Sequence, residues 1–510
     1  MLLGIDFGTT RTLVAAVDRG NYPVVSFTDT AGDACAHVPS LAALGPRGLV
    51  YGFDALAAAA DGAPVLRSFK RLLGRPDVLP DTPIGLGGRE YPVLDVVTGF
   101  LAALATALRE HSNLPIKRGD RKLEAVVAVP AHAFAAQRFL TLEAFKAAGF
   151  EVVALLNEPS AAGLEYTHRQ PATLSSRRSR VVVYDLGGGT FDASLVEVAD
   201  RRHDVLATAG LNRLGGDDFD ALLLELGLAA LRIPAEEVAG VDRAAALLAC
   251  RDAKERLTPQ SRRISLDLGP LLGETIVAVD AFYAAATPLV ERTLEAMAPV
   301  LARLDDGAEE APDGLAEIAG LYLVGGGSGL PLVPRILRER FGRRVHRSPY
   351  PAASTAIGLA IAADPDSGMT LSDRYGRGFG VFRELDDGRR VSFDPIVLPD
   401  TPLPASGQHT VARRYRPAHN IGHFRFAECS SIDPALGEPR GDLQPLGELV
   451  FPFDRTLRGR DLRTTPVARA GGAVEIEECY LLGADGLVEV RIRDVEDDFQ
   501  MRLRLDHAAR

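Results

Sequence analysis

The stretch from Val181 to Val198, V-V-V-Y-D-L-G-G-G-T-F-D-A-S-L-V-E-V, constrains the fold more than any other part of the chain. Its two ends are rich in β-forming residues, so the pattern predicts a strand, a tight turn and a second strand. The three glycines from 187 to 189 allow the backbone to approach a ligand closely, and the free N–H groups of such a turn bind anions. A plain β-hairpin would show the same pattern, so this motif alone does not establish a site.

A second copy of the pattern begins the chain. Residues 4–10 read G-I-D-F-G-T-T, and an apolar, β-forming stretch follows them up to Val17. Two such hairpins about 180 residues apart predict two related lobes, each gripping the phosphates of one nucleotide. Asp6, Asp185 and Asp192 flank the two turns, and their carboxylates suit a Mg²⁺ ion held largely through water.

The paired motifs resemble the phosphate motifs of the actin-like ATPase superfamily. The sequence Y-D-L-G-G-G-T-F-D resembles the corresponding motif of the heat-shock protein 70 (Hsp70) chaperones. This resemblance implies an α/β fold, with a two-lobed actin-like (ribonuclease H-like) ATPase domain followed by an all-β sandwich domain that binds polypeptide. We place the ATPase domain at 1–363, a linker at 364–376 and the β-sandwich at 377–510, where hydrophobicity alternates with a period of two. Because the chain ends at Arg510 directly after a predicted strand, we expect no helical lid.

Lys70 is the first candidate catalytic residue. Only five of the 57 basic residues are lysines, and a compact ammonium can orient water beside a γ-phosphate. The string K-R-L-L-G-R also matches the family, in which this lysine is catalytic. By the same resemblance, Glu158 reaches the metal and its water, Thr190 takes part in proton handling, and Asp192 joins the catalytic group. The alternative for Lys70 is a solvated surface lysine. The alternative for Glu158 is a first-turn glutamate that the helix dipole favours.

The predicted nucleotide-binding residues lie in the glycine-rich turns and in a helix that, in the family, lines the adenosine. A third turn, G-G-G-S-G, follows a predicted strand at 321–324 and precedes a predicted helix at 331–340, which suits close approach to a purine and ribose. The full set is Gly8, Thr9, Thr10, Gly187, Gly188, Gly189, Thr190, Gly216, Lys254, Thr258, Gly325, Gly326, Gly327 and Ser328. The resemblance implies ATP or ADP with Mg²⁺, and K⁺ as a further ion.

Two regions depart from the family pattern. The arginine that usually covers the purine falls at Gly329, and a facing Glu and Arg fall at Arg251 and Glu255, so those two charges are exchanged. Loss of the arginine removes about 1 kcal/mol of stacking, so we predict weaker nucleotide binding than is usual in the family. The family has a run of aliphatic residues in the linker that docks in the ATPase domain, whereas this linker has only Met369 and Leu371. Because apolar burial would drive that docking, the coupling of the two domains is left open.

Composition limits the partners. A net charge of −11 and a pI of about 5.5 argue against a general nucleic-acid binder. The four cysteines are far apart, which predicts free thiols in a reducing cytosol. No segment has the pattern of a secretion signal, and no run reaches the ~18 apolar residues of a membrane helix, so we expect a cytoplasmic monomer away from membranes.

The sequence therefore favours an ATP-hydrolysing chaperone that binds unfolded or extended polypeptide, or one dedicated protein partner, helped by a co-chaperone and a nucleotide exchange factor. The alternative is a nucleotide-dependent scaffold with little or no turnover. A small-molecule kinase of the same superfamily is disfavoured by the long family-specific motif and the predicted β-sandwich. A P-loop enzyme is excluded, because no Gly-Lys-Ser/Thr occurs.

Overall fold

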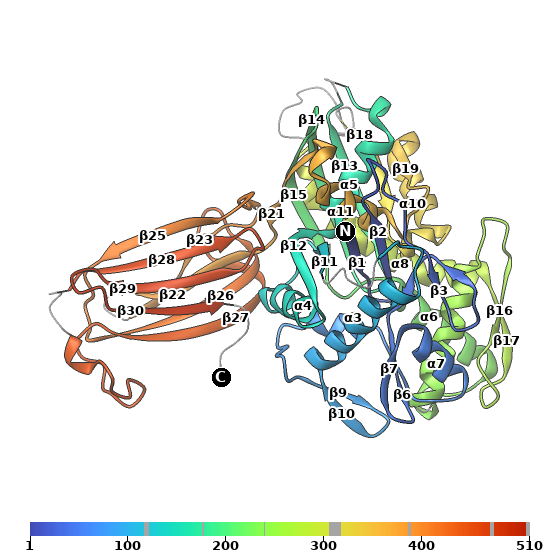
Figure 1. Ribbon diagram of the computed structural model, residues 1–510, viewed down its shortest axis with the longest axis horizontal. Helices are drawn as coiled ribbons and strands as arrows, with labels where there is room; N and C mark the ends of the chain where they lie inside the picture. Colours follow the sequence, from blue (N-terminus) through green and yellow to red (C-terminus); the bar gives the residue numbers. More distant parts are fainter. Residues whose placement is uncertain are drawn as a thin grey trace. The chain divides into compact units, whose positions relative to one another are not determined.

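The computed structural model describes residues 1–116, 122–175, 178–238, 240–304, 318–385, 389–469 and 474–505, and is shown in Figure 1. It divides into two compact units. The first comprises 1–74, 80–132 and 141–371, and the second comprises 75–79, 133–140 and 372–510. The break between Leu371 and Ser372 lies inside the segment that the sequence assigns to the linker.

A five-stranded sheet in the order β12-β11-β1-β2-β5 forms the first lobe of the first unit. The strand β1 pairs antiparallel with β2 and parallel with β11, and β11 pairs parallel with β12. Their bounds are β1 (Leu2–Phe7), β2 (Arg11–Ala16), β5 (Val38–Pro39), β11 (Leu123–Val129) and β12 (Phe150–Asn157). The first predicted hairpin is therefore confirmed.

The second lobe repeats this plan around a six-stranded sheet, β19-β18-β13-β14-β15-β20. Its hairpin is β13 with β14, and β13 also pairs in parallel with β18. The bounds are β13 (Arg180–Leu186), β14 (Phe191–Ala199), β15 (Arg202–Leu211), β18 (Ile318–Val324), β19 (Val345–Arg347) and β20 (Thr370–Ser372). In both lobes a hairpin and a parallel neighbour make up the centre of the sheet, as the repeated motif predicts.

The helices α5 (Glu158–Arg169) and α11 (Ser354–Ala363) pack closely against each other. A Cβ on Gly358 would overlap the carbonyl oxygen of Ala161, and one on Gly4 would overlap that of Ala356. Only glycine fits at these two contacts. Helix α11, which is rich in small residues, therefore approaches α5 closely.

Smaller elements complete the first unit. The short strands are β3 (Phe27–Thr28), β4 (Ala34–Cys35), β6 (Leu41–Gly45), β7 (Gly48–Tyr51), β8 (Val65–Arg67), β9 (Pro83–Leu86), β10 (Arg89–Pro92), β16 (Arg263–Asp267) and β17 (Glu274–Ala278). The helices are α1 (Gly52–Ala60), α2 (Lys70–Leu73), α3 (Val93–Glu110), α6 (Gly216–Leu231), α7 (Gly240–Glu255), α8 (Val279–Ala296), α9 (Ala298–Ala302) and α10 (Leu332–Phe341), whereas α4 (Ala135–Ala147) is divided between the two units. Among the described residues, no helix combines the length and the apolar character needed to cross a membrane.

The second unit contains a sandwich of two antiparallel four-stranded sheets, β23-β22-β26-β27 and β25-β28-β29-β30. Phe379 and Phe426 of one sheet contact Tyr480 of the other, with ring centroids 5.9 and 6.4 Å apart. The bounds are β22 (Gly378–Leu385), β23 (Arg390–Val397), β25 (Gln408–Tyr415), β26 (Ile421–Ile432), β27 (Pro439–Pro452), β28 (Ile476–Gly483), β29 (Val488–Asp494) and β30 (Gln500–Leu505), with β21 (Arg374–Tyr375) pairing with β24 (Thr401–Pro402). The β-sandwich expected from the alternating pattern is present.

The linker contributes an edge strand to the first unit. The strand β20 extends the second-lobe sheet beside β15, and the N–H of Thr370 donates to the carbonyl of Arg201 at 2.9 Å. Met369 and Leu371 pack, partly buried, against apolar clusters of this unit. The linker is therefore held on this unit by backbone pairing and two side chains rather than by a long aliphatic run, and the coupling of the two domains stays open.

Candidate active site

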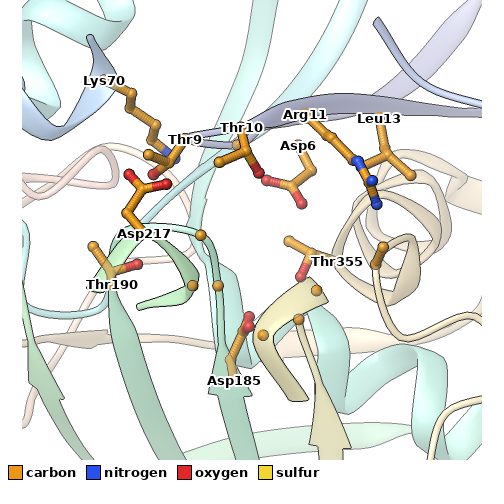
Figure 2. Close-up of a pocket in the computed structure, with 18 of the residues that line it drawn as sticks. Asp6, Thr9, Thr10, Arg11, Leu13, Lys70, Asp185, Thr190, Asp217 and Thr355 are labelled. Atoms are coloured by element: carbon orange, nitrogen blue, oxygen red, sulfur yellow. The ribbon is translucent and has the colours of Figure 1, made fainter. Parts of the chain in front are cut away.

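The two glycine turns face each other across a cleft in the first unit (Figure 2). A Cβ built on Gly188 would lie 2.9 Å from the side chain of Thr10. One built on Gly189 would lie 2.7 Å from the Oγ1 of Thr9. The glycines of the second turn thus allow an approach to the first turn that any side chain would prevent.

A further glycine segment fixes the start of helix α6 against the second turn. The N–H of Gly216 donates to the carbonyl of Gly187 at 2.9 Å, and that of Asp217 donates to Gly188 at 2.8 Å. A Cβ on Gly215 would lie only 2.6 Å from the nitrogen of Gly189. The helix therefore begins beside the turn, and a helix N-terminus favours negative charge such as phosphate.

A cavity of about 80 Å³ lies between the turns and adjoins a second cavity of about 960 Å³, with which it shares Lys254, Gly326 and Gly327. Ligand sites for small molecules usually span about 300–1,000 Å³, a range that contains the outer cavity, and the inner cavity continues it toward the two turns. The predicted residues that line the inner cavity are Asp6, Gly8, Thr9, Thr10, Lys70, Glu158, Asp185, Gly187, Gly188, Thr190, Gly216, Lys254, Gly325, Gly326 and Gly327. Thr258 lines the outer cavity.

Lys70 lies at the inner cavity and is only 4 % exposed, so the interpretation as a surface lysine is wrong. Its Nζ contacts the Oε1 of Glu158 at 2.7 Å, and both residues begin helices. Burial alone would lower the pKa of Lys70, but the carboxylates of Glu158, Asp6 and Asp192 together raise it. The site therefore holds a charged ammonium at neutral pH.

The buried aspartates give the cleft an excess of negative charge. Burial, and then repulsion by Glu158, raises the pKa of Asp6 to about 7. Burial raises the pKa of Asp192 to about 8, and it also shifts that of Asp185 well upward. A divalent cation would offset this repulsion. Among the described residues no three carboxylate, histidine or cysteine groups could hold an ion directly, so these residues fit Mg²⁺ bound through water and phosphate oxygens.

Three predicted site residues lie behind the cavity instead of lining it. Gly189 packs against Thr9, and Asp192 accepts a hydrogen bond from the N–H of Ala131 at 2.9 Å. Ser328 is fully buried after the third glycine turn. These residues support the walls of the site.

Comparison with known proteins agrees with this geometry. The Hsp70 protein family model matches residues 94–374. A chaperone protein HscA homolog of Pseudomonas fluorescens (strain SBW25) is 30 % identical over 99 % of this chain and 77 % of its own length. One from Burkholderia pseudomallei (strain 668) is 32 % identical over 97 % of this chain and 76 % of its own length.

This chain belongs to the Hsp70 family. It is an ATP-hydrolysing molecular chaperone of the Hsp70 type, and it binds ATP or ADP with Mg²⁺. Membership of this family also decides against the small-molecule kinase.

Several residues of this Hsp70 cleft were not predicted as site residues. Asp220 contacts the Nζ of Lys254 at 2.6 Å, and Lys254 also donates to the carbonyl of Gly216 at 2.7 Å, so the lysine ties α7 to the start of α6. Thr355 lines the inner cavity from α11. Asp220 lies in α6, one turn after the predicted residue Gly216, whereas no local motif marks Thr355.

Two arginines, Arg11 and Arg347, lie beside the altered positions Glu255 and Gly329 of this Hsp70. Glu255 pairs with Arg11, which begins β2 in the other lobe, and Arg251 lies 3.8 Å from Glu255. The Nη2 of Arg347 lies 3.5 Å from the position that a Cβ on Gly329 would take. An arginine from β19 thus reaches the place where the family arginine is missing. The expected loss of nucleotide affinity remains a prediction.

Proposed function

We propose that ATP is hydrolysed in the cleft between the two glycine turns, with Lys70 orienting the attacking water. The observation that carries this proposal is the meeting of both turns at one cavity, into which the Lys70–Glu158 pair also faces. Transfer of a phosphoryl group to water depends chiefly on positioning and on stabilisation of charge. The cleft provides fixed donors, a buried ammonium and buried carboxylates for this purpose.

The residues divide into three roles. The backbone N–H groups after Gly8 and Gly187 hold phosphate oxygens. Asp6, Asp185 and Asp192 hold Mg²⁺ largely through water, with K⁺ as a second ion, and their raised pKa values support the need for a cation. The three remaining catalytic side chains are Lys70, Glu158 and Thr190, of which Glu158 fixes the ammonium and Thr190 handles a proton.

The nucleotide state is proposed to control the binding of unfolded or extended polypeptide by the β-sandwich. The docked strand β20 supports such coupling, because it ties the linker to the second lobe. The alternative of a scaffold without turnover is supported by the poverty of aliphatic residues in the linker. The buried Lys70–Glu158 pair favours turnover over that alternative.

The curated relatives compared above are named as chaperones, and we extend the same kind of work to this chain. Its partners are then a polypeptide client, a co-chaperone and a nucleotide exchange factor. The net charge of −11 supports a protein that avoids nucleic acid. We further propose that it is a monomer of the cytoplasm.

Single-turnover hydrolysis of ATP by the Lys70→Ala variant tests the proposed chemistry. We expect the rate to fall by about 10²–10⁴-fold, because a positioned group of this kind contributes that much. ATP binding should persist, since the glycine turns remain. Lys122→Ala is the matched control, because Lys122 is an exposed lysine paired with Glu151 at 2.8 Å, and its rate should equal that of the wild type.

Two results would contradict the proposal. A wild-type rate no faster than that of the Lys70→Ala variant would favour the scaffold. A fall of the same size in Lys122→Ala would show that the loss at Lys70 does not report on the cleft.

A further inference from the structure

The β-sandwich has a groove of about 660 Å³ between two edge strands, β23 and β25, both labelled in Figure 1. Each is the terminal strand of its own sheet, so each has backbone N–H and C=O groups without a neighbouring strand. An extended peptide can pair with such an edge. The groove therefore offers main-chain pairing at its margins.

Aromatic rings form the floor of this groove. Phe424 and Phe453 lie edge to face with centroids 6.2 Å apart, and Tyr415 lies edge to face with Phe453 at 6.4 Å. Val391 and Val467 line the margins and are 63 % and 64 % exposed. Phe424 and Phe453 are only 6 % and 7 % exposed, so an apolar side chain that entered the groove would mainly cover the two valines, and apolar burial is favourable.

A buried carboxylate holds the floor in place. Glu478 is fully buried and accepts two hydrogen bonds from Arg383, at 3.1 and 2.7 Å. It also accepts from the hydroxyl groups of Tyr480, at 2.7 Å, and of Tyr415. Arg383 is further paired with Asp394 at 2.7 Å, so its charge is satisfied within the sandwich. Tyr415 is thereby held rigidly, and Arg383 is a support rather than a ligand.

The rim of the groove is positively charged although the domain is acidic. Residues 377–510 contain 19 arginines, no lysine and 22 acidic residues, whereas 401–427 contain four arginines and no acidic residue. Arg413, Arg416 and Arg425 line the groove, and among the described residues no ion pair within 4 Å involves them, although Arg425 lies opposite Glu448 and lowers the pKa of that carboxyl. Glu384 and Asp394 also line the groove, and Asp394 is paired with Arg383, so arginines outnumber the carboxylates of the lining. Asp386 and Asp387, in the segment between β22 and β23, lie outside the described residues.

We propose that this groove binds an extended peptide that carries acidic side chains on either side of an apolar residue. The rings accept the apolar side chain, and Arg413, Arg416 and Arg425 face the carboxylates. This inference rests on the proposed function, because it takes the β-sandwich to be the part that binds the client, and it adds the chemical class of that client. The acidic charge of the whole domain disfavours a nucleic acid, which needs an extended basic surface.

Fluorescence anisotropy with the full-length protein tests this inference. One labelled probe has central leucines flanked by glutamates, and a second has the same leucines flanked by lysines. We expect the glutamate peptide to bind about tenfold more tightly, since a few partly exposed ion pairs contribute roughly that much. Salt should weaken the glutamate peptide and not the lysine peptide, because salt screens exposed charges.

The double variant Arg413→Glu/Arg416→Glu should reduce binding of the glutamate peptide about tenfold and remove the preference. The matched control is Arg502→Glu, because Arg502 is an exposed arginine on β30, the strand of its sheet farthest from β25. This control should bind both peptides as the wild type does.

Four outcomes would overturn the inference. The first two are equal binding of the two peptides and preference for the lysine peptide. The third is that a single-stranded RNA binds more tightly than either peptide and that the double variant abolishes this RNA binding. The fourth is that this chain forms a dimer which the double variant dissociates. Hydrolysis of ATP is measured on the same preparations. A protein that hydrolyses ATP but shows no acidic preference refutes only this inference, whereas absence of hydrolysis refutes the proposed function.

Discussion

The nucleotide cleft and the groove of the β-sandwich handle charge in opposite ways. The cleft buries its carboxylates and one ammonium, with Asp192 2 % and Lys70 4 % exposed. The groove places unpaired arginines on an exposed rim above aromatic rings. Buried charges must be paired or neutralised by protons, whereas exposed charges are screened by salt. The cleft should therefore respond mainly to pH and divalent cations, and the groove mainly to salt.

The largest expected effect is a loss of stability of the nucleotide-free protein as the pH rises. In the unfolded chain the carboxyl groups ionise near pH 4, whereas burial raises the pKa of Asp6 to about 7 and that of Asp192 to about 8. Their contribution to stability is thus present below about pH 4 and is lost as the pH rises to about 8. We expect a loss on the order of a few kcal/mol, measured as a fall in unfolding temperature between pH 5 and about pH 8.5.

The Asp192→Asn variant tests whether the cleft causes this trend. Its unfolding temperature should change less with pH, because the amide does not titrate. Addition of Mg²⁺ with ADP should stabilise the wild type more at high pH, when the carboxylates are ionised. An identical pH slope in the wild type and in Asp192→Asn would show that the raised pKa of this residue does not control stability.

An intermediate effect is expected where the linker docks. Leu371 packs partly buried beside the second-lobe sheet, so Leu371→Asp would place a charge in an apolar contact at a cost of about 1–3 kcal/mol. We expect basal hydrolysis of ATP to be unchanged and its stimulation by unfolded peptide to be lost, as measured by steady-state turnover. Leu398→Asp is the control, because Leu398 is 53 % exposed. Stimulation that survives in Leu371→Asp would mean that docking of β20 does not couple the cleft to the client.

The sequence predicted the cleft far better than the groove, for a physical reason. Hairpins with glycine in the turn are determined by residues adjacent in the chain, so local pattern suffices. Boundaries were less accurate: the strand predicted at 321–324 is β18, Ile318–Val324. The sequence also did not show which motif residues line the cavity. Asp192 and Ser328 were predicted to belong to the site, but they lie behind the cavity.

The groove had no signal of this kind. Its floor combines Phe382, Tyr415, Phe424 and Phe453, which come from different strands and a loop and share no motif. Residues such as Thr355 were missed in the cleft for the same reason, because only the packing of α11 brings it to the turns. Contacts that depend on tertiary packing are not recorded in local periodicity, whatever the chemistry of the site.

The smallest expected effect concerns the pair of Arg11 and Glu255, which is part of the cleft but should behave like the groove. Their side chains are 29 % and 33 % exposed, and the pair joins the two lobes at the boundary of the inner and outer cavities. An exposed pair contributes less than about 1 kcal/mol, so Glu255→Arg should speed ADP release by about threefold at low salt. Stopped-flow fluorescence with a labelled ADP measures this rate.

The reciprocal variant Arg11→Glu/Glu255→Arg separates pairing from the loss of either side chain. It restores the opposite charges across the cleft, although Arg251, 3.8 Å from Glu255, then faces an arginine, so recovery should be incomplete. High salt should bring the release rates of the wild type and of Glu255→Arg together, because screening removes the advantage of the pair. A difference that persists at high salt would show that Glu255 acts by contact with the nucleotide. The mouth of the cleft would then resemble the buried cleft, which responds to pH, and not the groove, which responds to salt.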